Sequence, residues 1–144
     1  MKRLVLLIIL SFTFTASCAT DEESSFVTAE SFRANLASQA DGDAATLTEL
    51  RKYGVSADSE HKVEFFFYTN TLDKAKALAS ALEPNNADVY FGPAAGDDTQ
   101  FVVTGWSAPI KMDNATVTAW SEKMTRLGYE FDCEFDGWGT YTNQ

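Results

Sequence analysis

The most restrictive feature of the sequence is a segment whose apolar side chains cover both faces of one predicted strand. Within residues 61–68, Val63, Phe65 and Phe67 alternate onto one face, while Phe66 and Tyr68 occupy much of the other. A strand that is hydrophobic on both faces is typical of the centre of a sheet. We therefore expect residues 61–68 to form a central strand.

The segments that follow alternate between helical and strand periodicity. They are a helix over 72–82 capped by Asn70 or Thr71, strands 88–91 and 100–106 joined as a hairpin by the loop 92–99, a helix that begins at Asp113 or Asn114 and ends at Gly128, and a strand over 129–135. This order predicts an α+β fold of the ferredoxin-like split βαβ type, a four-stranded antiparallel sheet with two helices on one face. Right-handed crossovers place strands 61–68 and 100–106 in the centre.

Before this unit, the pattern predicts an additional N-terminal helix over 43–53. Asp43 is a suitable N-cap, and Gly54 stands where a helix often ends in a left-handed residue. Residues 26–40 fit either an amphipathic helix or a frayed linker, and Asp41-Gly42-Asp43 is expected to break the chain. The expected organisation is a signal peptide at 1–17, an anchor cysteine and linker at 18–42, and a folded domain at 43–144.

The N-terminus has the features of an export signal. Met1-Lys2-Arg3 is a short positive region, and the apolar run from Leu4 to Leu10 is too short for a confident membrane span. Thr15-Ala16-Ser17-Cys18 is similar to a bacterial lipobox. We expect an exported lipoprotein, acylated at Cys18 and facing the periplasm or the cell exterior. The alternative is ordinary signal cleavage near Ala19, which leaves no anchor.

Charge and composition exclude several functions. The net charge is −10, and removal of Lys2 and Arg3 with the signal peptide lowers it to −12, so the chain lacks the basic surface with which proteins hold nucleic acid. The sequence has one histidine, two cysteines and no glycine-rich phosphate loop, and we expect no cofactor and no metal. Cys133 lies between Phe131 and Phe135 on the core side of the last strand and is expected to be a buried, inert thiol.

Acidic residues are frequent but do not form a specific catalytic pattern. Glu130, Asp132, Glu134 and Asp136 alternate along the last strand and are expected on its solvated face; a hydrolase that uses two of them is the alternative and would require a carboxyl group with a raised pKa in a pocket. His61 has no second ligand at metal-binding spacing. Asp41-Gly42-Asp43 and Asp97-Asp98 fit a helix cap and a turn better than calcium loops.

The sharpest local motif is Asp136-Gly137-Trp138-Gly139-Thr140. Glycines on both sides of a tryptophan at a strand end indicate a bulge or a close backbone approach. Trp138 can seal the edge of the core, or it can anchor a protein partner on a recognition surface around Asp136. These five residues are the candidate binding site.

The run from Phe131 to Tyr141 resembles the terminal signature of the ribonuclease E inhibitor B family, also called regulator of ribonuclease activity B. Leu47 to Gly54, and Val63 to Phe67 with the helix 72–82, are similar to other parts of that family, so the resemblance covers about 43–141. It implies a ferredoxin-like, acidic, non-enzymatic domain that binds an endoribonuclease in the cytoplasm.

The export signal departs from that pattern. We therefore expect an exported, membrane-tethered protein-binding domain of this type, whose partner and oligomeric state the residues do not specify. A cytoplasmic endoribonuclease inhibitor remains the alternative if the signal is not used.

Overall fold

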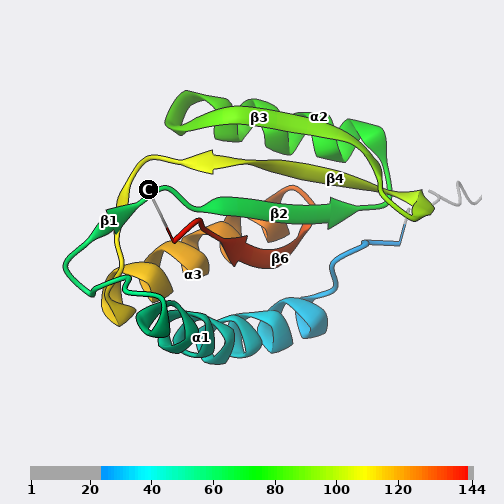
Figure 1. Ribbon diagram of the computed structural model, residues 1–144. Helices are drawn as coiled ribbons and strands as arrows, with labels where there is room; N and C mark the ends of the chain where they lie inside the picture. Colours follow the sequence, from blue (N-terminus) through cyan, green and yellow to red (C-terminus); the bar gives the residue numbers. More distant parts are fainter. Residues whose placement is uncertain (1–23, 143–144) are drawn as a thin grey trace, which may run out of the picture.

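The computed structural model describes residues 24–142 and has an α+β architecture (Figure 1). The helices are α1 (Ala29–Lys52), α2 (Leu72–Leu82) and α3 (Asn114–Glu130), with a short 3₁₀ turn at Glu83–Asn85. The strands are β1 (Glu60–His61), β2 (Glu64–Thr69), β3 (Asn86–Ala94), β4 (Asp97–Ser107), β5 (Ile110–Lys111) and β6 (Glu134–Gly139). Within residues 24–142 no helix combines the length and the apolar character needed to cross a membrane.

The main sheet has the strand order β3-β4-β2-β6, and every neighbouring pair is antiparallel. The ferredoxin-like prediction is therefore confirmed, with β2 and β4 in the centre. The hairpin of β3 and β4 is confirmed as well. β1 and β5 form a separate two-stranded ladder.

The core lies between one face of the sheet and the helices. Phe65 and Phe67 of β2, Val103 of β4 and Phe135 of β6 are buried against α2 and α3, and Cys133 is fully buried in the same cluster. Burial raises the pKa of the Cys133 thiol to about 11, so the neutral form predominates at neutral pH. The predicted buried, inert role of Cys133 agrees with this placement.

The N-terminal helix is longer than predicted. α1 runs without a break from Ala29 to Lys52, its N-cap is Thr28, and Asp43 is a buried residue in its interior instead of a cap. Residues 29–42, which the expected organisation placed in the linker, are thus helical, so the amphipathic-helix alternative for residues 26–40 is the one that the structure supports from Ala29 on. Gly42 costs this helix roughly 1 kcal/mol relative to alanine, but contacts along the whole helix offset that cost.

Those contacts come from residues distant in sequence. Phe32 stacks on Tyr129 of α3 with ring centroids 4.2 Å apart, and the side-chain amides of Asn35 and Gln39 donate to the backbone carbonyl of Phe135 at 2.8 and 3.1 Å. α1 therefore covers the outer edge of β6 (Figure 1). An uncovered edge strand would leave its backbone groups available for pairing with another chain.

The boundary between α3 and the last strand also differs from the prediction. α3 continues through Gly128 to Glu130, and β6 begins only at Glu134. Gly128 does not end the helix; a Cβ there would lie 2.5 Å from the Cys133 carbonyl oxygen and 2.9 Å from the Phe67 ring. The glycine is required for close packing, and the turn occurs at Asp132, which has a positive φ of 55°.

The two helical glycines give a matched test of this packing. Gly128→Ala should lower the free energy of unfolding by about 1–3 kcal/mol because the added methyl group meets backbone and a buried ring. Gly42→Ala should raise it by about 0.5–1 kcal/mol, since nothing lies within 4 Å and alanine favours the helix. Chemical denaturation of both variants checks the signs, and a stabilising Gly128→Ala would contradict the close approach.

Candidate functional site

The Asp136–Thr140 motif forms the second half of β6 and contains the predicted bulge. Phe67 pairs with Phe135 and Phe66 pairs with Gly137, which leaves Asp136 as an extra residue in β6. Gly137 has φ +118°, a conformation that residues with a Cβ rarely adopt. The glycine before Trp138 is thus needed to restore the register after the bulge.

Trp138 lies on the helix side of the sheet. It pairs with Phe65, is partly buried, and packs against both core clusters. Its indole N–H donates to Asp43 Oδ1 at 2.7 Å. Asp43 is only 2% exposed, and burial raises the pKa of its carboxyl group, an effect that the hydrogen bond from Trp138 partly opposes.

The other motif residues point elsewhere. Asp136 is exposed on the bulge, Gly139 pairs with Glu64, and the Thr140 hydroxyl donates to the Lys62 carbonyl at 2.7 Å. The motif therefore has two sides: Trp138 joins α1 to the sheet, whereas the Asp136 carboxylate faces solvent.

The acidic residues expected to alternate along one strand are distributed over three elements. Glu130 belongs to α3, Asp132 lies in the turn, and Glu134 and Asp136 are exposed on β6. Asp132 was expected on a solvated face, and this prediction is wrong. Its carboxylate accepts hydrogen bonds from the Phe26 and Val27 N–H groups and from Ser25 Oγ, and it pairs with Lys74 Nζ at 2.8 Å.

Asp132 attaches the start of the described chain to the turn between α3 and β6. Partial burial alone would raise the pKa of its carboxyl group, but Lys74 and the hydrogen bonds from residues 25–27 lower it to about 2. The ionised form is therefore the one that the folded protein stabilises.

The other sequence candidates do not form a catalytic or metal centre in the described part of the chain. His61 is 7% exposed and is the second residue of β1, where it pairs with Ile110 of β5. Asp97 accepts from the N–H and hydroxyl of Thr99, but Asp97 and Asp98 are the first residues of β4, so the predicted turn at these two residues is wrong; the turn lies at residues 95–96. Between residues 24 and 142 no group of three or more His, Cys, Asp or Glu residues is placed to hold a metal ion.

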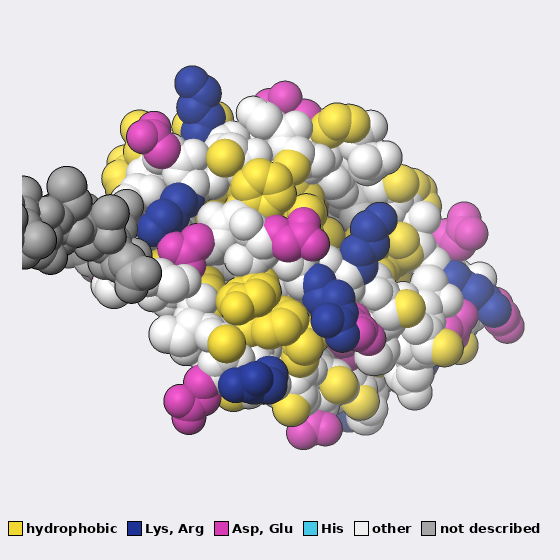
Figure 2. Space-filling model, turned by 180° about the vertical axis from the view of Figure 1, so that it is seen from behind, with side chains coloured by type: hydrophobic (Ala, Val, Ile, Leu, Met, Phe, Trp, Pro, Cys, Tyr) yellow, Lys and Arg dark blue, Asp and Glu magenta, His cyan; other side chains and the backbone are white. Residues whose placement is uncertain are grey.

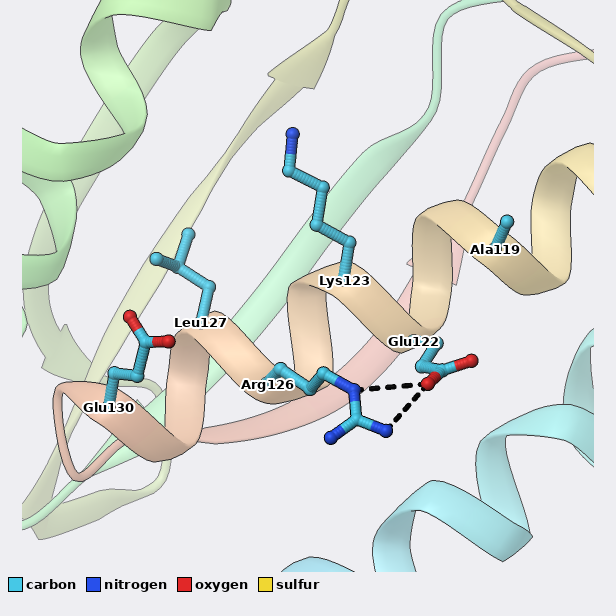
Figure 3. Close-up of a pocket in the computed structure, with 6 residues that line it drawn as sticks. All are labelled: Ala119, Glu122, Lys123, Arg126, Leu127 and Glu130. Atoms are coloured by element: carbon cyan, nitrogen blue, oxygen red, sulfur yellow. Dashed lines mark hydrogen bonds and ion pairs between the residues drawn. The ribbon is translucent and has the colours of Figure 1, made fainter.

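Hollows on the helical side are shallow and carry mixed charge. One of about 420 Å³ lies along α3, where Glu122 pairs with Arg126 at 2.7 Å and Lys123 extends away from both (Figure 3). Seen from this side, acidic, basic and hydrophobic side chains are interspersed over the surface (Figure 2). In the described part of the chain, the helical side therefore shows no patch of a single charge sign and no group of converging catalytic side chains.

The sequence analysis placed no candidate residue on the opposite face of the sheet, which we call the open face. It carries Glu64, Phe66, Tyr68, Tyr90, Val102, Thr104, Trp106 and Glu134, with Asp88 and Tyr141 at its margin. Phe66 and Tyr68 were the sequence signal for this face. Helices cover only one face of this fold, so a β2 strand with hydrophobic side chains on both faces must leave those of the other face uncovered by helices.

Fold and surface together define an acidic α+β domain suited to binding, without a recognisable catalytic centre in residues 24–142. A family model for regulator of ribonuclease activity B matches residues 40–140, and the chain belongs to this RraB family. Proteins of the family are non-enzymatic inhibitors of ribonuclease E, and the predicted non-enzymatic role agrees with this membership. No curated protein matches the chain.

The contacts of Asp132 predict a specific pH dependence. Its folded pKa lies below the ordinary value of 3.8, so its stabilising effect is present above that pH and is lost as the pH falls towards 2. After a discount for solvent screening, the effect is about 1–2 kcal/mol. Asp132→Asn keeps a side chain that tolerates positive φ and should remove this part of the stability difference between pH 6 and pH 2.

Asp136→Asn, on the exposed bulge, is the matched control. Its free energy of unfolding should change with pH as that of wild type does. Urea denaturation at several pH values measures both variants. If the free energies of unfolding of wild type and Asp132→Asn change with pH in parallel, the Asp132 carboxylate does not hold residues 25–27 as described.

Proposed function

We propose that this RraB-family domain acts outside the cytoplasm, held at a membrane by a lipid on Cys18, and regulates its target by binding a protein. Cys18 and the export signal lie outside the described residues, and the support for them is the Met1-Lys2-Arg3 region, the apolar run after it and the Thr15-Ala16-Ser17-Cys18 boundary. The proposed binding site is the Asp136–Thr140 motif, with Asp136 as its exposed group.

The observation that carries the proposal is the position of the Ser25–Val27 attachment. Asp132 holds these three residues, so only seven peptide units separate Cys18 from the folded domain. Such a segment spans at most about 25 Å when fully extended. An acylated protein would therefore be held close to the membrane surface, within reach of partners there.

Cytoplasmic inhibition of ribonuclease E is the second candidate, and the family membership favours it. The two candidates differ in location, because an exported domain does not meet a cytoplasmic enzyme. Export and cytoplasmic inhibition therefore make opposite predictions for the same fractionation experiment.

The anchor is tested by metabolic labelling with a fatty acid and by fractionation of cells that express the full chain. Wild type should be labelled and membrane-associated, whereas Cys18→Ser should be unlabelled. Cys133→Ala is the matched control and should be labelled like wild type, since Cys133 is buried in the core. An unlabelled wild type in the cytoplasmic fraction would reject the anchor and favour the second candidate.

The binding site is tested by crosslinked capture from membranes with two variants. Asp136→Ala should remain folded and lose the partner, because Asp136 is exposed and makes no core contact. Trp138→Ala should lower the free energy of unfolding by about 3–5 kcal/mol, since it removes a ring packed in both clusters and the bond to Asp43.

Asp98→Ala removes an exposed carboxylate from the start of β4 and serves as the control for capture. It should behave like wild type. If Asp136→Ala retains every partner that wild type retains, the Asp136–Thr140 motif is not the binding site.

A further inference from the structure

We propose that the open face of the sheet binds an extended, arginine-bearing segment of a protein partner. The proposal rests on the protein-binding function but not on export or the lipid anchor. It names a second surface, distinct from the exposed side of the Asp136 bulge, and the chemistry of what occupies it.

The register of the strands shows which residues share this face. In β2 and β4, Glu64 pairs with Trp106, Phe66 with Thr104 and Tyr68 with Val102. Paired residues of an antiparallel sheet point to the same side. The residues between them, such as Phe65 and Val103, are fully buried on the helix side, so the first set faces away from α2 and α3.

The open face extends over the neighbouring strands. Tyr90 of β3 pairs with Thr104, and Glu134 of β6 pairs with Tyr68. Figure 1 looks onto this side of the sheet, with α2 and α3 behind the strands. The aromatic residues therefore form a layer across three strands that no helix covers.

Several of these rings are exposed and held in place. Tyr90 is 56% and Tyr141 is 62% exposed, and Tyr141 stacks on Trp106 with centroids 5.4 Å apart. A Cβ on Gly92 would lie 2.3 Å from the Tyr90 hydroxyl oxygen, so this glycine lets the Tyr90 side chain lie along β3. Exposed, preordered tyrosine and tryptophan rings are characteristic of binding surfaces.

The charges on the open face select the kind of partner. Glu64 and Glu134 lie among the rings, and Asp88 lines a hollow of about 220 Å³ together with Trp106, Tyr141 and Lys62. Asp88 is the one carboxylate and Lys62 the one cation of this hollow; Glu64 and Glu134 bring the open face to three carboxylates, and the whole chain carries a charge of −10. A phosphate backbone or a second copy of this acidic chain would be repelled.

Arginine fits this combination better than lysine. Its planar guanidinium stacks on aromatic rings and can donate two parallel hydrogen bonds to a carboxylate. Lysine presents a compact, strongly hydrated charge that makes neither contact as well. The juxtaposition of Glu64 with Trp106, and of Asp88 with the Trp106–Tyr141 stack, therefore favours arginine side chains.

The test uses the full chain and three synthetic probes: a fluorescent peptide of alternating arginine and serine, the same peptide with lysine, and oligouridylate. We expect the arginine peptide to bind at least about fivefold more tightly than the lysine peptide. Glu64→Gln and Trp106→Leu should each weaken binding of the arginine peptide about tenfold. Glu64→Gln removes a charge and keeps the shape of the side chain. If Trp106→Leu fails to fold, Glu64→Gln alone therefore still tests the open face.

Tyr53→Ala and Glu122→Gln are the controls because both residues are exposed on other elements. Equal affinity of all variants would show attraction by net charge alone and overturn the proposal, as would equal affinity for arginine and lysine or tighter binding of oligouridylate. If the open-face variants still capture the cellular partner and Asp136→Ala does not, this inference fails while the proposed binding function stands.

Discussion

The structure depends on one asymmetry: β2 is hydrophobic on both faces, but the helices cover only one of them. The inner face, with Phe65 and Phe67, is buried against α2 and α3 and joins the largest cluster of the core. The outer face, with Phe66 and Tyr68, extends into the aromatic open face. The same strand therefore accounts for the stability of the sheet and for the surface most suited to binding.

α1 is an addition to the ferredoxin-like core, and its contacts tie the last strand to the N-terminal part of the domain. Its residues Asn35 and Gln39 cover the edge of β6 by donating to the Phe135 carbonyl. Its residue Asp43 accepts a hydrogen bond from the indole N–H of Trp138. The family signature in β6 and the N-terminal helix are thus physically coupled. Asp132 extends this coupling to Ser25–Val27, so the start of the described chain is also attached to the turn before β6.

Much of the fold could be predicted, because its core elements have regular periodicity and local caps. Thr71 and Asp113 cap α2 and α3 as expected, and the four strands occur in the predicted order. The failures have a common cause. Asp43 and Gly128 have the local character of a cap and a terminator, but Asp43 is held by Trp138 and Gly128 is required by Phe67 and Cys133.

The sequence by itself determined the α+β class, the central place of β2, the burial of Cys133 and the family resemblance, because hydrophobic periodicity and short motifs are local properties. Only the tertiary structure decided that Trp138 faces the core, that Asp132 binds the N-terminal segment and that the aromatic residues of three strands share one open face. These outcomes depend on hydrogen bonds and strand registers between residues up to about a hundred positions apart, which local periodicity does not specify.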